Sequence, residues 1–408
     1  MARFGLLGKT LGHSFSPFIH ARFGAPGYAL FEVSEEELAA FMRGGAWTGI
    51  NVTVPYKKAV VPYLDALSGI ARRTGSVNTV VRLPDGRLFG DNTDVAGFTA
   101  AASRLGLDVK GKKAVVLGSG GAGVAVRAAL EDMGADCVVV SRSGEDNYGN
   151  LDRHADAALV VNATPVGMFP HNGEAPVSLA AFPRCEGVID LIYNPARTRL
   201  LMEAEERGVP CENGLYMLVA QARRSAELFH GRPIEEKEVG AVCDALRAQT
   251  LNLVLIGMPG CGKSTMARAL GALTGREVVD ADEAFTARFS RSPAEVIRED
   301  GEAAFRDRES ALLRELGRRT GIVLATGGGA VTREENYAPL HQNGVIVWLK
   351  RELAALPDAG RPLSQSRGAA ALYAEREPLY RRFADLAWEW DEGVPPDAQG
   401  LLAAALGQ

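Results

Sequence analysis

Residues 114–123 read AVVLGSGGAG, and residues 253–265 read LVLIGMPGCGKST. In each stretch a short apolar run leads into a glycine-rich turn, and a helical pattern follows the turn. A buried strand, a glycine turn and a helix N-terminus with outward-facing amides are the parts of a phosphate-binding site. Two such units of different kinds predict two nucleotide sites, and therefore two enzymes joined end to end.

The bulk composition is typical of a globular protein. The 408 residues are 47% hydrophobic and 23% charged, which is enough for two or three domains with their own cores. A formal net charge of −5 argues against a nucleic-acid partner, and no apolar run approaches the ~18 residues that cross a bilayer. The N-terminus lacks the long apolar core of a signal peptide.

Cysteine and histidine are scattered through the sequence. The five cysteines and six histidines follow no metal-binding spacing. This pattern predicts free thiols, a cytoplasmic location and no structural zinc. We expect small-molecule substrates, no membrane partner, and a monomer or small homo-oligomer.

Short apolar runs alternate with helical patterns almost throughout, which predicts an α/β fold with parallel sheets flanked by helices. No linker rich in Pro, Gly or Ser separates the two motif regions, and we place the main boundary near residue 249. The expected domains are an N-terminal α/β substrate domain (residues 1–103, completed by helices over 215–247), a Rossmann-type domain (104–214) and a P-loop domain (250–408).

The first glycine turn fits the dinucleotide pattern G-x-G-x-x-G. The pattern alone is a weak signal that a simple turn also explains, but the strand before it and the helix after it favour a dinucleotide site. About twenty residues on, an NAD site places an acidic residue against the ribose 2′-hydroxyl. This chain has Arg142 there, which suits the 2′-phosphate of NADP. Glu145 and Asp146 oppose that preference, and Arg142 as a solvated loop charge is the alternative.

Four polar clusters precede the dinucleotide motif, at strand ends or turns. Their Ser, Asn, Thr, Lys and Asp side chains suit a small ligand that carries hydroxyls and one carboxylate. Lys57 and Asp94 form a plausible proton-transfer pair, because a carboxylate holds a neighbouring ammonium in place. Turn and cap formation explains any single cluster equally well. The clusters are GHSFSP (12–17), NVTVPYK (51–57), SVNTV (76–80) and GDNTD (90–94).

The second glycine turn fits G-x-x-x-x-G-K-[ST] at every position of residues 257–264. Backbone amides of such a loop cradle phosphates, Lys263 reaches the β- and γ-phosphates, and the Ser264 hydroxyl ligates Mg²⁺. After the next strand come Asp280 and Asp282, where a carboxylate organises the metal shell or takes a proton from a hydroxyl. Arg306 lies in a charge-dense helical stretch in which a solvated face is the ordinary expectation.

The ordered motifs over residues 4–235 resemble the shikimate dehydrogenases, with further matches at NATPVGM (162–168), DLIYNP (190–195) and NGLYMLVAQA (213–222). The resemblance implies NADPH-dependent reduction of 3-dehydroshikimate to shikimate, with Lys57 and Asp94 as the acid–base pair. Ser14 and Ser16 would bind the substrate carboxylate. The other implied substrate residues are Asn51, Thr53, Asn78, Tyr193 and Gln221, and the implied cofactor residues are Gly118, Gly120, Gly121, Ala122, Gly123, Arg142 and Met217.

Residues 251–390 resemble shikimate kinase through GEAAFRDRE (301–309), ATGGGAV (325–331), GRPL (360–363) and REPLYRRFA (376–384). The resemblance implies transfer of the ATP γ-phosphoryl group to the shikimate 3-hydroxyl, with Lys263 and Asp282 as catalytic residues. Shikimate would be bound by Arg306, Gly328, Gly329 and Arg376. ATP would be bound by Gly260, Gly262, Ser264, Thr265 and a lid residue, Arg361, and Mg²⁺ by Ser264 and Asp280.

Together the two resemblances imply a bifunctional enzyme of the shikimate pathway of aromatic amino acid biosynthesis. The product of the first half would be the substrate of the second. Two alternatives stay open. In the first, the chain is a quinate/shikimate dehydrogenase fused to a kinase for another small polyol. In the second, one half is a non-catalytic nucleotide-binding module. Both halves keep their candidate catalytic residues, which argues against the second alternative.

Overall fold

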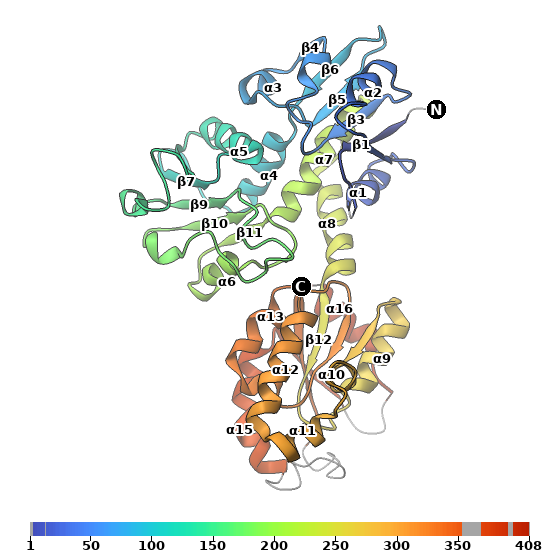
Figure 1. Cartoon of the computed structure of the whole chain (residues 1–408), viewed down its shortest axis with the longest axis vertical. Coiled ribbons are helices and arrows are strands. Elements are labelled where there is room, and N and C mark those ends of the chain that lie inside the picture. Colours follow the sequence, from blue (N-terminus) through green and yellow to red (C-terminus); the bar gives the residue numbers. More distant parts are fainter. Residues whose placement is uncertain (1–2, 13, 353–368, 391–394, 408) are drawn as a thin grey trace. The chain divides into compact units, whose positions relative to one another are not determined.

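The computed structural model describes residues 3–12, 14–352, 369–390 and 395–407. The chain divides into two compact units (Figure 1). The first unit comprises Met1–Met168, Glu174–Tyr193 and Leu200–Cys243, and the second comprises Phe169–Gly173, Asn194–Arg199 and Asp244–Gln408.

The first unit begins with a six-stranded sheet of order β2-β1-β3-β5-β6-β4. β1 pairs in parallel with β2 and β3, whereas β5 runs antiparallel to β3 and β6. β5 and β6 form a hairpin because the short turn at Pro84, Asp85 and Gly86 leaves no room for a parallel crossover. The α/β class is confirmed, with this antiparallel hairpin as an addition. The strands are β1 (Phe4–Gly8), β2 (Ala29–Glu32), β3 (Gly49–Val52), β4 (Ala66–Leu67), β5 (Thr79–Arg82) and β6 (Leu88–Asp91).

Short helices connect these strands, and one long helix from later in the chain, α7, returns to the sheet. α4 packs along α7, and α7 also contacts α1 and β5. The helical pattern after residue 214 forms two helices, because Gly231 ends α7 in a left-handed conformation and Pro233 follows. The helices are α1 (Ser16–Arg22), α2 (Leu38–Gly44), η1 (Val61–Tyr63), α3 (Gly69–Thr74), α4 (Asp94–Arg104), α7 (Gly214–His230) and α8 (Glu236–Thr250).

The second sheet of the first unit has five parallel strands in the order β11-β10-β9-β7-β8. β7 lies inside this sheet, which explains why its run of apolar residues is continuous rather than alternating. The first glycine turn follows β7 and leads into α5. The elements are β7 (Lys113–Leu117), α5 (Gly121–Asp132), β8 (Asp136–Val140), η2 (Leu151–His154), β9 (Leu159–Asn162), η3 (Leu179–Ala181), β10 (Gly187–Asp190), α6 (Arg199–Glu206) and β11 (Cys211–Asn213).

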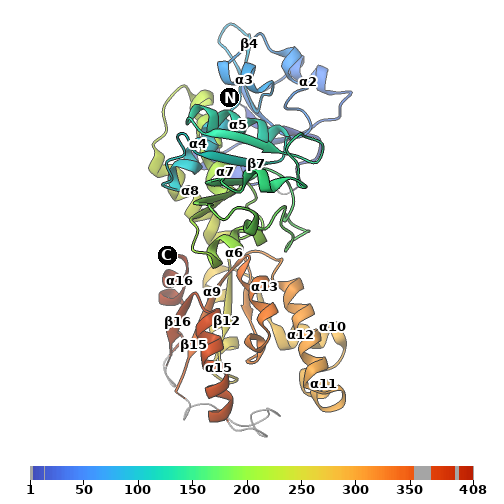
Figure 2. The ribbon, with the colours of Figure 1, turned by 90° about the vertical axis from the view of Figure 1, so that its left-hand side faces the viewer.

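The second unit contains a parallel sheet of order β13-β14-β12-β15-β16, with the second glycine turn between β12 and α9. Figure 2 shows α10, α11 and α12 on one side of this unit. The elements are β12 (Asn252–Ile256), α9 (Lys263–Thr274), β13 (Val278–Asp280), α10 (Ala281–Phe289), α11 (Pro293–Asp300), α12 (Glu302–Leu316), β14 (Val323–Ala325), η4 (Ala330–Thr332), η5 (Glu334–Asn336), α13 (Tyr337–His341), β15 (Gly344–Lys350), α15 (Ala369–Phe383), β16 (Leu386–Glu389) and α16 (Ala398–Leu406).

Each sheet is buried under its own apolar core. In the second unit the core includes the fully buried strand residues Leu253, Val254, Ile346 and Val347. Among the described residues, we find no helix that is both long and apolar enough to cross a bilayer.

Candidate active sites

The first unit holds a pocket of about 330 Å³ that is lined from β3, the first residue of α4 and α7. The structure brings together in it the predicted acid–base pair and every predicted substrate-binding residue of the first half. Apolar and backbone groups to which the sequence analysis assigned no role complete the wall: Leu6, Val52, Leu191, Gly214 and Leu218. The predicted residues that line the pocket are Ser14, Ser16, Asn51, Thr53, Lys57, Asn78, Asp94, Ala122, Tyr193, Met217 and Gln221.

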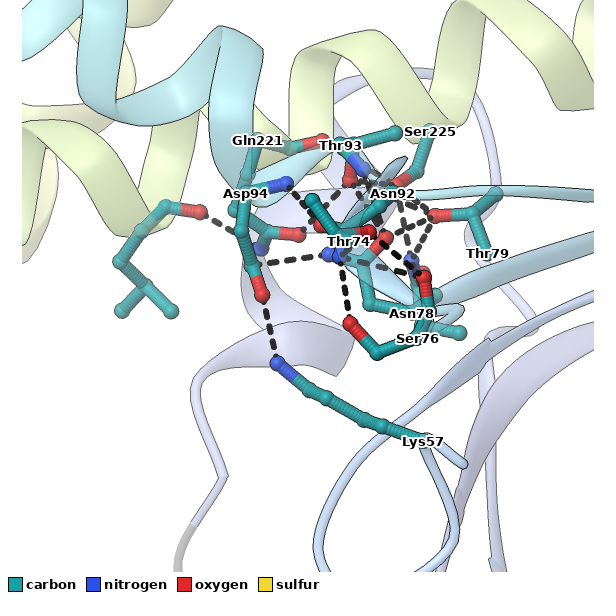
Figure 3. Close-up of polar contacts among 12 residues, drawn as sticks. Lys57, Thr74, Ser76, Asn78, Thr79, Asn92, Thr93, Asp94, Gln221 and Ser225 are labelled. Carbon is teal, nitrogen blue, oxygen red and sulfur yellow. Dashed lines mark hydrogen bonds and ion pairs between the residues drawn. The ribbon is translucent and has the colours of Figure 1, made fainter. Parts of the chain in front are cut away.

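Lys57 and Asp94 form a close ion pair in this pocket (Figure 3). Lys57 Nζ lies 2.6 Å from Asp94 Oδ2, and the two side chains are 25% and 12% exposed. The other carboxylate oxygen, Oδ1, accepts a hydrogen bond from Asn78 Nδ2 at 2.8 Å. Asp94 is also the first residue of α4, where the helix dipole favours a negative charge. The carboxylate is therefore fixed from two sides and holds the ammonium group at the pocket wall.

Two further pocket amides are held by buried hydroxyl groups. Asn51 Oδ1 accepts from the Tyr28 hydroxyl at 2.7 Å. Gln221 Oε1 accepts from Thr93 Oγ1 at 3.3 Å, and Thr93 Oγ1 also lies 3.1 Å from Asn78 Oδ1. Thr93 belongs to the GDNTD cluster, but no motif pointed to it as a site residue. The amides are thus oriented by the protein itself.

The pocket mouth carries the serines and an aromatic side chain. Ser14 and Ser16 stand at the start of α1, and the Ser16 backbone N–H donates to Ser14 Oγ at 3.2 Å. Tyr193 is partly exposed and packs beside Phe15, with 5.9 Å between ring centroids. These positions leave polar groups accessible to a ligand carboxylate.

The first glycine turn borders the same pocket through Ala122. A Cβ on Gly123 would lie 2.0 Å from Gly118 O, so only glycine allows this close turn. At Gly120 and Gly121 a Cβ would face open space, and the backbone there is accessible to a ligand. The turn, followed at once by the N-terminus of α5, fits the pyrophosphate of a dinucleotide.

Arg142 lies exposed in the turn after β8. Asp146, one of the two acidic residues that oppose a 2′-phosphate, pairs with His154 Nε2 at 2.8 Å. Asp146 is therefore engaged within the protein. The part of Arg142 in cofactor choice stays a prediction.

The second unit holds a larger pocket of about 1030 Å³, between the P-loop (residues 257–265), α10, α12 and the glycine turn after β14. Except for Arg361, which lies outside the described residues, every predicted kinase residue lines it. Glu309 also lines the pocket, although no motif singled it out. The predicted residues are Gly260, Gly262, Lys263, Ser264, Thr265, Asp280, Asp282, Arg306, Gly328, Gly329 and Arg376.

The P-loop side chains are held at defined positions. Lys263 is buried, and its Nζ donates to Gly257 O at 2.9 Å and Met258 O at 3.0 Å. Ser264 Oγ donates to Asp280 Oδ2 at 2.6 Å. Across the described residues, no group of three or more His, Cys, Asp or Glu side chains could hold a metal ion. A magnesium ion beside Ser264 and Asp280 would thus take most of its ligands from phosphate and water, as Mg²⁺ commonly does.

Elsewhere in this pocket, a pair of buried charged side chains forms part of the wall. Arg306 Nη1 lies 2.6 Å from Glu309 Oε2, and the two side chains are only 7% and 4% exposed. Burial raises the pKa of Glu309. Arg306 also lies against Gly329, where a Cβ would be 2.1 Å from Nη2. The solvated-face alternative for Arg306 is therefore wrong.

Two guanidinium groups, those of Arg306 and Arg376, line the pocket. Their Nε atoms are buried and donate no hydrogen bond within the described residues. Arg376 Nη1 donates to Gly328 O at 3.2 Å. Guanidinium donors that converge on one pocket suit a carboxylate or phosphate.

Comparison with known proteins identifies the first half. Residues 6–80 match the family model described as the shikimate dehydrogenase substrate binding domain. A shikimate dehydrogenase (NADP(+)) of Clostridium perfringens (strain SM101 / Type A) is 32% identical over 271 residues, which cover 61% of this chain and 100% of that protein. The chain belongs to the shikimate dehydrogenase family. The resemblance seen in the motifs is thus confirmed.

Solved structures of shikimate dehydrogenases share the fold of this half. One is a chorismate mutase/shikimate 5-dehydrogenase fusion protein from Clostridium acetobutylicum, 39% identical, with a TM-score of 0.57 over 60% of this chain and 96% of that chain. Another is shikimate 5-dehydrogenase from Thermus thermophilus in complex with NADP(H) and shikimate, 34% identical, with a TM-score of 0.55 over 60% and 99%.

The second half matches a different enzyme. Residues 259–401 match the family model described as shikimate kinase. The chain therefore joins a shikimate dehydrogenase to a shikimate kinase domain, as the two groups of motifs indicated.

Proposed function

We propose that the chain reduces 3-dehydroshikimate to shikimate with NADPH and phosphorylates the shikimate 3-hydroxyl with Mg-ATP. The observation that carries the proposal is the pocket of the first unit, in which Lys57, Asp94 and the predicted substrate residues converge. The dehydrogenase–shikimate complex from Thermus thermophilus supports the substrate class. The match of residues 259–401 to shikimate kinase supports the second step, because it consumes the product of the first.

In the first reaction Ser14 and Ser16 bind the substrate carboxylate, and Asn51, Thr53, Asn78 and Gln221 contact the ring hydroxyls. NADPH supplies the hydride to the ketone carbon. The Lys57–Asp94 pair delivers a proton to the ketone oxygen, and Asn78 keeps Asp94 in place through its 2.8 Å hydrogen bond. Arg142 would hold the 2′-phosphate of the cofactor, and Met217 would help to bind the cofactor.

In the second reaction Arg306 and Arg376 hold the shikimate carboxylate, and the turn at Gly328 and Gly329 borders the ring. Asp282 lies near the reacting hydroxyl and takes its proton as the bond to phosphorus forms. Lys263 stabilises negative charge on the transferred phosphoryl group and on the departing ADP. Arg361, which lies outside the described residues, is proposed as a further ligand of ATP.

We propose three domains for these tasks. The substrate domain of the dehydrogenase spans 1–103 and includes 215–247, the cofactor domain spans 104–214, and the kinase spans 250–408. The grouping of β1–β6, β7–β11 and β12–β16 into three separate sheets supports this division.

Separate assays of the two activities test the proposal. NADPH oxidation with 3-dehydroshikimate and ATP consumption with shikimate are measured on the full chain, on Lys57→Ala and on Lys263→Ala. We expect Lys57→Ala to lose about 10³-fold in the first assay only. We expect Lys263→Ala to lose a comparable factor in the second assay only.

Lys58, an exposed neighbour, gives a matched control, since Lys58→Ala should change neither activity. ATP turnover that survives Lys263→Ala would overturn the kinase proposal. Faster turnover of quinate than of shikimate would overturn the choice of dehydrogenase substrate.

A further inference from the structure

Ser225, in the middle of α7, places a buried hydroxyl behind the dehydrogenase pocket (Figure 3). Its side chain is 0% exposed and does not line the pocket. Ser225 Oγ nevertheless lies 2.8 Å from Asn51 Nδ2, 2.7 Å from Thr79 Oγ1 and 3.1 Å from Thr93 Oγ1. It also lies 3.1 Å from the backbone oxygen of Gln221, one turn earlier on the same helix. One hydroxyl thus connects α7 to residues of β3, β5 and the β6–α4 turn.

The direction of the hydrogen bond between Asn51 and Ser225 follows from which of the neighbouring atoms carry hydrogen. Asn51 Nδ2 lies 3.3 Å from Asn78 O, a carbonyl oxygen that carries no hydrogen, so the amide nitrogen faces this side. Asn51 therefore donates to Ser225 Oγ. The single hydrogen of Ser225 goes to Gln221 O or to one of the two threonine hydroxyls. Ser225 is consequently the shared acceptor of the cluster.

The orientation of the Asn51 amide depends most directly on the Ser225 hydroxyl. Its Oδ1 accepts from Tyr28, and Ser225 Oγ is the nearest of the three acceptors around its Nδ2. Without the serine hydroxyl, Nδ2 keeps only Thr79 Oγ1 at 3.1 Å and Asn78 O at 3.3 Å. The Asn51 amide would then be held by longer hydrogen bonds on its nitrogen side, and its orientation in the pocket wall would be less closely fixed.

Gln221 is connected to the same hydroxyl through Thr93. Thr93 Oγ1 contacts Ser225 Oγ at 3.1 Å and Gln221 Oε1 at 3.3 Å. When Thr93 accepts from Ser225, its own hydrogen goes to Asn78 Oδ1 at 3.1 Å or to Gln221 Oε1 at 3.3 Å. Ser225 thus contacts one pocket amide, Asn51 on β3, directly, and is connected to a second, Gln221 on α7, through Thr93.

We propose that Ser225 is a positioning residue for the dehydrogenase reaction, acting through Asn51 and Gln221 on the substrate ring. The inference rests on the proposed function, because it takes the ligand of this pocket to be a small polyhydroxylated carboxylic acid. Ser225 reaches the Lys57–Asp94 ion pair only indirectly, through Thr93 and Asn78. The backbone N–H of Thr93 donates to Asn78 Oδ1 at 2.8 Å and stays in place without the serine hydroxyl, so the effect falls on substrate binding rather than on proton transfer.

The test compares the steady-state kinetics of shikimate oxidation by NADP in the wild-type chain and in Ser225→Ala. We expect the KM for shikimate to rise about tenfold, as for the loss of a buried hydrogen bond that orients a ligand contact. The kcat should stay within about threefold and the KM for NADP within about twofold, since the ion pair and the glycine turn are untouched.

Ser103→Ala is the matched control. Ser103 lies on α4 and makes the same type of bond to the backbone four residues earlier, with Oγ donating to Thr99 O at 2.9 Å. It is exposed and this hydrogen bond lies outside the cluster, so its removal should leave all kinetic constants unchanged. A second variant, Ser225→Cys, keeps the shape with a weaker donor and acceptor and should give an intermediate KM.

A double-variant cycle separates positioning from general loosening of the fold. In an Asn51→Ala background, Ser225→Ala should raise the KM for shikimate by no more than about threefold, because most of the route to the ligand is already gone. Equal effects in both backgrounds would overturn the inference, as would an unchanged KM in Ser225→Ala. If Ser225→Ala does not fold, Ser225→Cys decides by the same criteria. An inactive wild-type chain would instead overturn the proposed function.

Discussion

The two pockets of this chain present polar groups to small ligands in different ways. In the dehydrogenase pocket, one ion pair stands among neutral amides and hydroxyls that bond to one another. In the kinase pocket, buried guanidinium groups and a buried carboxylate carry most of the polarity. Neutral hydrogen bonds contribute modestly each, whereas an unpaired buried charge is very costly. The most damaging single change should therefore be one that leaves a buried charge of the kinase pocket without its partner.

The largest expected effect is that of Arg306→Ala in the kinase pocket. The change removes a donor to the ligand and leaves Glu309 buried without its partner at 2.6 Å. We expect kcat/KM for shikimate phosphorylation to fall about 10³-fold and the free energy of unfolding of the second unit to fall by about 3–5 kcal/mol. Coupled ATP assays and chemical denaturation measure the two quantities.

Arg308→Ala on the same helix is the control for buried charge. Arg308 is 36% exposed and pairs with Asp300 at 2.9 Å. Its loss should cost no more than about 1 kcal/mol, with little change in activity. Similar losses from both arginines would contradict the contrast between the pockets.

The next effect concerns the single ion pair of the dehydrogenase pocket. Asp94→Asn keeps an oxygen that can accept from Asn78 but removes the charge that holds Lys57. We expect kcat for shikimate oxidation to fall about 10²- to 10³-fold with a small change in KM. A large rise in KM with an unchanged kcat would show that Asp94 binds substrate without taking part in proton transfer. Asp132→Asn, which breaks a surface pair with Arg73, is the control.

A pH effect on stability follows from buried residues next to Asn51 of the dehydrogenase pocket. Tyr28, which donates to Asn51, stacks on His20, with 4.2 Å between ring centroids. Burial, aided by the nearby His230, lowers the pKa of His20 to about 3. The unfolded chain takes up a proton near pH 6.5, whereas the folded chain does so only near pH 3. The contribution to stability is therefore complete above about pH 6.5 and is lost as the pH falls toward 3.

Between pH 6.5 and pH 5 the first unit should lose about 2 kcal/mol of unfolding free energy through His20. Urea unfolding across this range measures the slope. His20→Phe keeps a ring against Tyr28 but cannot titrate, so its slope should be smaller by that amount. Equal slopes in the two proteins would rule out His20 as the source.

Local motifs could be predicted from the sequence where a short spacing determines the structure. The glycine turns at Gly118 and Gly257 follow apolar strands, and each loop stands where its motif predicted. The polar clusters around Lys57 and Asp94 were predictable for the same reason. Their convergence into one pocket depended on the family resemblance, because spacing alone does not say which strand ends meet.

Residues that act through tertiary packing could not be predicted in this way. Ser225 is an ordinary serine in a helical pattern, and only the packing of α7 against β5 and α4 buries its hydroxyl. Glu309 stands three residues after Arg306 in a charge-dense stretch, where periodicity alone indicates a solvated face. Gly301 divides that stretch into α11 and α12, and α12 carries both charges into the pocket.

The smallest expected effect is that of Glu309→Gln, which removes the buried negative charge but keeps the shape. The amide oxygen can still accept from Arg306 Nη1, and Glu302 still pairs with Nη2 at 3.2 Å. Arg306 should therefore remain in the pocket with a less defined direction, and the KM for shikimate should rise about tenfold with kcat nearly unchanged. Glu315 lies on α12 like Glu309 but forms an exposed pair with Arg288 of α10, so Glu315→Gln should leave both constants unchanged. A loss as large as that of Arg306→Ala would mean that the negative charge itself, rather than the hydrogen bond it accepts, holds the guanidinium in place.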